Sequence, residues 1–418
     1  MGGTWLMVRR SLAQHLLSTC VTVLATALAS GLVMSVFALA TQSQRAFVGV
    51  PSGFNAVLGA RGSQLQLVLA TVFHLETLPG NIPWSMYKEI EKDPAIELAI
   101  PYAVGDNYFG FRIVGTTRDY FESVQFREGE RFEVYEGGDF FDPTLREAVI
   151  GSLVARELNL TVRSTIYAYH GTAFDAQAKH EEPFRVIGIL KPTNSPADWV
   201  IWIPIDAIFS MTGHVLRGSG ENYEAKKGET IPDEHKEVSA VMLKLRTHKA
   251  GMLLSQRINR QGNLATLAWP IGNTMAQFFS KLAWMNGILQ VVAYLVVVVA
   301  AGAILAAIYN SINERRREFA IMRALGAGRR TVFSAIVVES GTIAAIGTLA
   351  GFAVYLTIMF GAASVIRTQT GVVIDVWQPH AALLYTPIGM VLVGCLAGIL
   401  PAFKAYSTDV ATNLVPTT

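Results

Sequence analysis

The sequence predicts an α-helical membrane protein with four transmembrane helices and an α+β extracytoplasmic domain inserted between helices 1 and 2. Composition is the first reason: 51% of the 418 residues are hydrophobic, only 16% are charged, and the mean hydropathy is +0.36. A soluble protein of this length is less apolar. The second reason is charge placement, because segments of membrane-spanning length carry almost no charged residue.

Four apolar runs are long enough to cross a bilayer, which takes about 20 helical residues. They lie within Ser11–Gln44 and at about Trp284–Asn310, Val332–Ile366 and Ala381–Phe403. A helix is the expected form because an isolated run in lipid must satisfy its own backbone hydrogen bonds. A cleaved signal peptide is an alternative for the first run, but this run is about twice the length of a signal core.

The stretch "TWLMVRRSLAQHL" precedes the first span. It places Trp5, Val8, Leu12 and Leu16 along one face of a helix, beside two arginines, as in an amphipathic helix at the membrane interface. An early start of the first transmembrane helix is the alternative.

Basic residues in short flanking segments remain in the cytoplasm. Arg9 and Arg10 therefore place the N-terminus inside, Lys404 places the C-terminus inside, and Glu314–Arg330, with six arginines and two glutamates, is a cytoplasmic loop. The segment Arg45–Lys281 then lies outside. The expected location is the bacterial cytoplasmic (inner) membrane, with residues 1–44, 45–281 and 282–418 as the three parts of the chain.

The segment Arg45–Lys281 carries 24 Lys and Arg against 27 Asp and Glu, an ordinary balance for a soluble domain. Strands are expected at "FRIVGTT", "EAVIG", "FRVIGIL", "WVIWIPI" and "SAVMLKLR", and helices at "PWSMYKEIEKD" and "SLVARELNL". The apolar segment Gly59–Pro83 is either part of the domain core or a surface beside the membrane that a hydrophobic substrate would meet. Both cysteines, Cys20 and Cys395, fall in predicted spans, so no disulfide is expected in this domain.

Catalytic signatures are missing from the sequence. No Gly-Lys pair occurs, so the phosphate loop of ATP-binding proteins is absent, and no Ser-His-Asp or Cys-His grouping can be assembled. No catalytic residue and no bound cofactor are expected. His74 and Glu76 invite a metal interpretation, but two side chains fall short of the three or four ligands of a zinc site.

The Glu314–Arg330 loop is similar in sequence to a segment of a known protein family. The stretch "RREFAIMRALGAGRR" is similar, from Arg317 to Ala327, to a phrase in permease subunits of the MacB and FtsX type, also called type VII ABC transporters, with departures at Ala320 and Met322. The runs "FRIVGTTRDYFESVQFREGERF", "EAVIGSLVARELNL" and "FRVIGILKPT" resemble the MacB-like periplasmic core domain, and "ILPAFKAYSTDVATNL" resembles the closing phrase of the family. The resemblance covers nearly the whole chain.

The resemblance implies that residues 314–330 form a coupling helix that docks on a separate ATPase subunit, which would hold ATP and Mg. Helical spacing gives the loop an apolar edge of Phe319, Met322 and Leu325 or Gly326, and basic side chains that suit such a partner. The alternative is that the arginines only fix topology and contact lipid headgroups. The expected coupling residues are Arg316, Arg317, Glu318, Phe319, Met322, Arg323, Leu325, Gly326 and Arg330.

Glu339 is the single charge within the third apolar run. A carboxylate in lipid is costly unless it is paired or close to the interface. We expect either a polar contact to the coupling region, with Arg329 or Arg330 as partner, or simple placement at the interface.

The function implied by the resemblance is that of a permease subunit that couples ATP hydrolysis on a partner to movement of its extracytoplasmic domain. Export or extraction of a hydrophobic, lipid-linked or peptide substrate, as in efflux or lipoprotein transport, is the first interpretation. A signalling or scaffold subunit that activates a periplasmic enzyme or sensor is the second, and an accessory to metal uptake is the third. The expected partners are the ATPase, a second permease copy or paralogue, a periplasmic adaptor and membrane lipids, but not nucleic acid.

Overall fold

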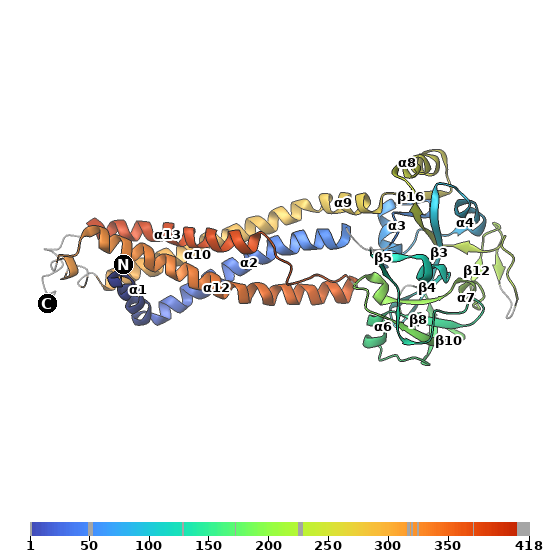
Figure 1. The fold of residues 1–418 in the computed structure, drawn as a ribbon, viewed down its shortest axis with the longest axis horizontal. Helices are drawn as coiled ribbons and strands as arrows, with labels where there is room; N and C mark the ends of the chain where they lie inside the picture. The colour runs from blue at the N-terminus through green and yellow to red at the C-terminus, as the bar shows by residue number, and fades with distance from the viewer. Residues whose placement is uncertain are drawn as a thin grey trace. The chain divides into compact units, whose positions relative to one another are not determined.

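The computed structural model describes two compact units (Figure 1). The membrane unit comprises Met1–Ser43, Leu282–Ser364 and Asp375–Thr418, and the inserted domain comprises Gln44–Lys281 together with Val365–Ile374. Within these ranges the described residues are 2–48, 53–127, 129–171, 173–224, 229–315, 318, 321–323, 326–370 and 372–407.

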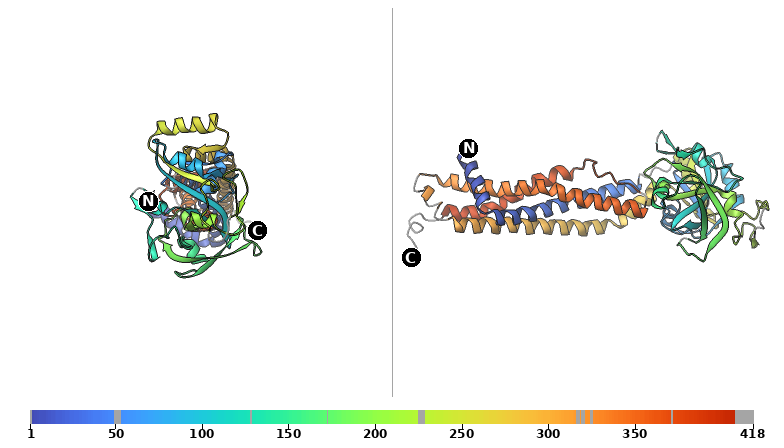
Figure 2. Two further views of the ribbon diagram at one scale, coloured as in Figure 1. Left: turned by 90° about the vertical axis from the view of Figure 1, so that its right-hand side faces the viewer. Right: turned by 90° about the horizontal axis from the view of Figure 1, so that it is seen from below.

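Four long helices run side by side in the membrane unit (Figures 1 and 2). Each contains a segment that is long and apolar enough to cross a membrane, which confirms the four predicted spans. The helical form follows from the length of the apolar runs, because only a helix pairs all its backbone groups internally. The four helices are α2 (Leu16–Val48), α10 (Ala283–Glu314), α12 (Arg329–Thr370) and α13 (Ala382–Ser407).

A separate helix, α1 (Gly2–Gln14), lies ahead of the first span, and a turn divides it from α2. The N-terminal segment is therefore not an early start of the first transmembrane helix. Val8 is buried and Leu12 packs in an apolar cluster with side chains of α10 and α12, whereas Trp5 and Leu16 are exposed. The buried face of α1 is narrower than the stripe predicted from its sequence.

Small residues bring α12 close to two neighbouring helices. A Cβ atom placed on Gly351 of α12 would lie 3.0 Å from the carbonyl oxygen of Ala27 in α2. A Cβ atom placed on Gly398 of α13 would lie 2.8 Å from Cβ of Ser340 in α12. Both glycines follow another glycine by four positions, the spacing that lets membrane helices approach closely.

A ten-stranded mixed sheet organises the inserted domain, with strand order β16-β1-β15-β3-β4-β11-β8-β10-β7, and β9 pairs with β10 and β3. The pairs β8–β10 and β4–β11 are parallel. All the strands predicted from sequence are present, as β4, β8, β10, β11 and β15. The strands of this sheet are β1 (Ala56–Ala60), β3 (Ile96–Tyr108), β4 (Phe111–Thr116), β7 (Val134–Gly137), β8 (Glu147–Ile150), β9 (Thr165–His170), β10 (Lys179–Leu190), β11 (Val200–Pro204), β15 (Ala240–Leu245) and β16 (Ala265–Ala268).

Helices and short strand pairs complete the inserted domain. The two predicted helices are present as α4 and α6, so the α+β fold is confirmed. The helical elements are α3 (Gln64–Thr71), α4 (Trp84–Glu91), α5 (Asp119–Ser123), α6 (Ser152–Glu157), η1 (Pro196–Trp199), α7 (Ile205–Phe209), α8 (His248–Gln256), η2 (Arg257–Gln261) and α9 (Ile271–Lys281). The short pairs are β2 (Ile82–Pro83) with β14 (Glu237–Val238), β5 (Gln125–Arg127) with β6 (Glu130–Arg131), and β12 (Val215–Leu216) with β13 (Tyr223–Glu224).

The sheet has a hydrophobic core on each face. Successive side chains of a strand point to opposite faces, and accordingly Ile201 belongs to one core and Trp202 to the other. The segment Gly59–Pro83 contributes Leu67 to the second core, where it is fully buried. Its interpretation as core is therefore confirmed. Val372, which follows α12, is buried in the same core.

Candidate functional site

The loop between α10 and α12 contains the residues that the sequence assigned to coupling. Arg316, Arg317, Phe319 and Leu325 lie outside the described residues. Among the described members, Glu318, Gly326 and Arg330 are exposed, and Met322 and Arg323 are half-buried. Of positions 319, 322 and 325, which were expected to form an apolar edge, only Met322 is among the described residues.

A defined turn ends the helical residues 321–323 of this loop. Gly326 has φ +99°, its N–H donates to the carbonyl oxygen of Arg323 at 3.1 Å, and the N–H of Ala327 donates to that of Met322 at 3.0 Å. These two bonds are the Schellman pattern, in which a left-handed residue satisfies the last carbonyl groups of a helix. Glycine suits this position because it lacks the Cβ that opposes positive φ.

A buried polar network of Ser11, Arg315 and Glu339 lies where this loop leaves α10. Nη1 of Arg315 donates to Oγ of Ser11 at 2.6 Å and lies 3.7 Å from Oε2 of Glu339. The Ser11 hydroxyl in turn donates to Oε1 of Glu339. Arg315 and Glu339 are each 8% exposed, and a charge this buried is tolerated only when it is paired and hydrogen-bonded. The network therefore joins α1, the end of α10 and α12.

The partner of Glu339 in this network differs from the one expected. The sequence named Arg329 or Arg330, which lie on the same helix as Glu339. Arg330 and Glu339 are nine positions apart on the helix, a rise of about 13.5 Å, which is too far for a direct ion pair. Arg315 reaches Glu339 from a neighbouring helix instead.

Further polar contacts surround this network on its exposed side. Nε of Arg315 donates to Oε2 of Glu318 at 3.0 Å, so one arginine bonds both the buried carboxylate region and the loop. Nδ1 of His15 lies 3.1 Å from Oε2 of Glu314, a pair whose carboxylate is half-exposed. Sequence reasoning missed Ser11 and Arg315 as site residues. Arg315 could have been found from its position, because it is the first charged residue after Glu314, where an apolar run ends.

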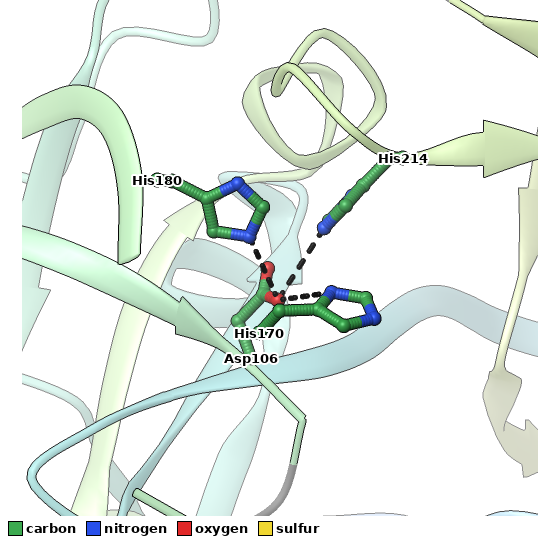
Figure 3. Close-up of side chains that lie close together, drawn as sticks. All are labelled: Asp106, His170, His180 and His214. Atoms are coloured by element: carbon green, nitrogen blue, oxygen red, sulfur yellow. Dashed lines mark hydrogen bonds and ion pairs between the residues drawn. The ribbon is translucent and has the colours of Figure 1, made fainter. Parts of the chain in front are cut away.

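A second constellation lies in the inserted domain, far from this loop in sequence. Three histidines surround one carboxylate oxygen: Oδ1 of Asp106 lies 3.3 Å from Nδ1 of His170, 3.4 Å from Nε2 of His180 and 3.3 Å from Nε2 of His214 (Figure 3). Asp106 is fully buried and His180 is buried, whereas the His170 side chain is 62% exposed. These four residues are termed the histidine–aspartate cluster.

The charges in the histidine–aspartate cluster affect one another. Burial alone would raise the pKa of Asp106, but hydrogen bonds with the three imidazoles hold this pKa below its ordinary value. The hydrogen bond to Asp106 raises the pKa of His170 and of His180, against the effect of burial. The carboxylate therefore attracts positive charge to this point of the domain.

The sequence predicted no metal ligands, and His74 with Glu76 was the pair that invited a metal interpretation. The group of metal-ligand side chains that gathers among the described residues is the histidine–aspartate cluster, which includes neither of them. His74 instead packs edge-on to Trp202, with ring centroids 6.2 Å apart. The cluster was missed because its members come from separate segments, although His170 and His180 belong to the two strands of one hairpin, β9 and β10.

Comparison with known families covers both units. Residues 19–260 match the MacB-like periplasmic core domain, and residues 290–410 match the FtsX-like permease C-terminal domain. An uncharacterised ABC transporter permease of Methanocaldococcus jannaschii is 24% identical over 248 residues, which are 56% of this chain and 57% of the relative. The chain thus matches little more than half the length of that relative.

Two solved structures match about half of the chain at low structural similarity. The periplasmic region of MacB from Actinobacillus actinomycetemcomitans is 12% identical, with a TM-score of 0.32, and the match covers 56% of this chain and 94% of that one. The extracellular domain of the noncanonical ABC-type transporter YknZ from Gram-positive bacteria is 15% identical, with a TM-score of 0.29, and the match covers 51% and 99%.

Proposed function

Because the chain belongs to the MacB and FtsX family of ABC transporter permeases, we propose that it passes ATP-driven movement from a separate ATPase to its inserted domain. It is an inner-membrane protein with four spans. The observation that carries the proposal is the buried network of Ser11, Arg315 and Glu339, which connects the start of the loop between α10 and α12 to two other helices.

The network suits a coupling role because its bonds are directional. Apolar side chains in a bundle can slide past one another at a small cost in free energy. Separation of a buried arginine from its carboxylate costs far more, because it leaves a buried charge without its partner. A force applied to the loop at Arg315 would therefore draw α1 and α12 with it. The bond from Arg315 to Glu318 extends the same connection into the loop itself.

The loop offers a docking surface of the expected chemistry. Ile321 is 43% exposed, Arg330 is exposed, and Arg316 and Arg317 add charge to the same segment. An apolar anchor flanked by arginines suits a groove with acidic rims, the arrangement in which a few residues carry most of an interface energy. In this proposal ATP and Mg are bound by the partner ATPase, and this chain has no catalytic residue.

The proposed orientation follows the arginines, with both termini in the cytoplasm and the inserted domain outside. Membership of the family supports a dimer of permease chains, an adaptor at the inserted domain, and export or extraction of a hydrophobic, lipid-linked or peptide substrate. A signalling subunit that moves without transport remains the competing proposal, and transport of a candidate substrate into vesicles decides between them.

Co-purification tests the docking proposal. The double variant Met322→Asp/Arg323→Glu places acidic groups on the loop, so we expect loss of the ATPase from the affinity-purified complex, because interface anchors are often worth about 2 kcal/mol or more each. Arg246→Glu, a charge reversal at an exposed site of the inserted domain, is the matched control. Wild-type recovery of the ATPase with the double variant would refute docking through this loop.

Cysteine labelling tests the orientation separately. In a background with Cys20 and Cys395 replaced by alanine, a cysteine at Ser219 should react with a membrane-impermeant maleimide in spheroplasts. A cysteine at Gly328 should react only after the membrane is permeabilised. Reaction of Gly328→Cys in intact spheroplasts contradicts the proposed topology, whatever the outcome of the co-purification.

A further inference from the structure

The histidine–aspartate cluster has the donor set and the spacing of a metal site, and we propose that Asp106, His170, His180 and His214 bind a divalent transition-metal ion, with Zn²⁺ as the favoured occupant. Their candidate ligand atoms all lie within 4.8 Å of one another. The proposal concerns the inserted domain alone and does not depend on coupling to an ATPase.

The three distances from Oδ1 of Asp106 match the edges of a tetrahedral metal site and lie just beyond the usual length of a hydrogen bond. Zinc–nitrogen and zinc–oxygen bonds of about 2.0–2.1 Å make the edge of a tetrahedron about 3.3–3.4 Å long. Oδ1 of Asp106 lies 3.3–3.4 Å from one nitrogen of each histidine. Hydrogen bonds between nitrogen and oxygen are usually 2.7–3.2 Å long. A modest inward shift of the imidazoles would complete the coordination shell.

Backbone contacts turn two of the imidazoles toward a cation. Nδ1 of His180 lies 3.0 Å from the carbonyl oxygen of Thr212, and Nδ1 of His214 lies 3.0 Å from that of Ile208. A carbonyl oxygen only accepts, so each Nδ1 carries a proton, and in the neutral ring Nε2 is left with its lone pair. Both lone pairs then point at the Asp106 carboxylate. Such a contact is favourable only when a second proton on each ring or a bound cation lies between the nitrogen and the carboxylate, and second-shell carbonyls of this kind are typical of zinc-bound histidines.

The carboxylate itself has an unused acceptor. Oδ2 of Asp106 is buried, and it has no hydrogen-bond partner among the described residues. A buried carboxylate is expected to have most of its acceptor positions filled. A metal ion bound at Oδ1 would offset the negative charge that the carboxylate shares over both oxygens.

Irregularities in three strands place the ligands. The β3–β4 pairing shifts register between Val104 and Asp106, and the β9–β10 pairing shifts between Lys179 and Pro183, next to His180. Such bulges re-aim side chains and are frequent beside functional sites. The side-chain amide of Asn107 donates to the carbonyl oxygens of Tyr169, Gly171 and Ala173 at 3.2, 2.9 and 3.0 Å, which fixes the backbone on both sides of His170.

An access route adjoins the ligands. A cavity of about 150 Å³ is lined by His170 and His214, together with polar side chains that include Asn81, Glu237 and Ser239. Because His170 and His214 line this cavity, an ion that enters it meets two of the four ligands directly. A site needs such a path in order to exchange metal with its surroundings.

The donor set selects the metal. Three imidazoles and one carboxylate suit Zn²⁺ and its neighbours among the late divalent transition metals, whereas Mg²⁺ and Ca²⁺ prefer oxygen ligands. Four protein ligands make a closed site, which is the arrangement of structural rather than catalytic zinc. The bound ion would tie β3, the β9–β10 hairpin and the segment between α7 and β12 together, and would thereby stabilise the inserted domain.

Metal titration of the purified full-length chain tests the site. The protein carries no histidine tag, is stripped with a chelator and is titrated with Zn²⁺ against a competing indicator. We expect about one Zn²⁺ per chain, and affinity at least 100-fold weaker in His180→Gln and His214→Gln. His248→Gln, at an exposed histidine of the same domain, is the matched control and should bind as wild type does.

Cobalt spectroscopy on the wild-type chain gives an independent measurement that needs no variant to fold. Co²⁺ bound by nitrogen and oxygen in a tetrahedral site shows intense visible absorption, which an equimolar amount of Zn²⁺ should abolish. Absence of stoichiometric Zn²⁺ in the wild type, equal binding by the cluster variants and the control, or preference for Mg²⁺ or Ca²⁺ would each overturn the assignment.

Discussion

Nη1 of Arg315, at the end of α10, lies 3.7 Å from Oε2 of Glu339 in α12, and both residues are 8% exposed. This ion pair connects the loop that follows α10 to the helix that follows the loop. Removal of Arg315 would take from the buried Glu339 carboxylate the arginine that pairs with it, which typically costs about 3–5 kcal/mol, whereas removal of both residues costs less than the sum of the two single losses.

A double-variant cycle tests this relationship. We expect Glu339→Gln and Arg315→Gln each to lower the melting temperature in nanodiscs and to weaken permease-stimulated ATP hydrolysis, and the combined variant to lose less than the two losses added. Glu314→Gln is the control, because its carboxylate is half-exposed and surface pairs contribute little. Strictly additive losses would show that Arg315 and Glu339 do not interact.

The turn at Gly326 leads to a second prediction. A side chain at φ +99° is strained, so Gly326→Ala should disturb the end of the helical residues 321–323 and reduce co-purification of the ATPase several-fold. Gly328→Ala is the matched control, since a Cβ there would meet nothing closer than 3.9 Å. Equal recovery of the ATPase with both variants would show that this turn does not shape the docking surface.

The close packing of α2 on α12 leads to a third prediction. Gly351→Ala should lower the melting temperature of the membrane unit by several degrees, because its Cβ would lie 2.0 Å from Oγ of Ser30 and 3.0 Å from the carbonyl oxygen of Ala27. Gly361→Ala adds the same methyl group to the same helix where nothing lies within 4 Å. Similar melting temperatures for the two variants, measured in the same nanodiscs, would contradict close packing of α2 on α12.

A fourth prediction concerns pH. Burial, and then the nearby charge of Arg112, lowers the pKa of His74 to about 3, whereas an unfolded histidine has a pKa of about 6.5. Between these values the unfolded state binds a proton that the folded state does not, so the free energy of unfolding falls as pH drops below about 6.5. Above pH 7 this contribution is constant.

Substitution of His74 isolates this effect. Asparagine cannot titrate, and it tolerates the left-handed backbone of His74, φ 56°. We expect the melting temperature of His74→Asn to fall less steeply than that of the wild type between pH 7 and pH 5, as followed by tryptophan fluorescence. Parallel curves for the two proteins would show that His74 is accessible to protons in the folded domain.

Features set by local sequence were predictable. The four spans follow from the length of apolar runs, and β11 and β15 follow from β-branched residues bounded by turns, because each of these signals lies within one segment. The turn at Gly326 was not predicted, because the sequence named this residue only as a coupling residue through the family resemblance. Local periodicity also predicted an apolar stripe on α1, but only part of this stripe is buried in the structure. Tertiary packing decides which side of a short helix faces inward, and the local sequence does not contain that information.

Features that depend on distant pairing were not predictable. Glu339 was recognised as a costly charge, yet its partner was misassigned, because the sequence does not tell which helix ends meet. Asp106 and His214 are brought together by the register of β3 and by the segment after α7, and bulges alter that register. No spacing rule along one segment contains this information.

Helix α12 has 42 residues and belongs to both units, since its final residues from Val365 group with the inserted domain. At 1.5 Å per residue it is about 63 Å long, roughly twice the thickness of the hydrocarbon core. It contains no proline, unlike α13, whose interior holds Pro387 and Pro401. In the proposed coupling, a rod of this length without a proline hinge would act as a lever arm, because a small tilt at the Glu339 end would sweep a far larger arc at the other end.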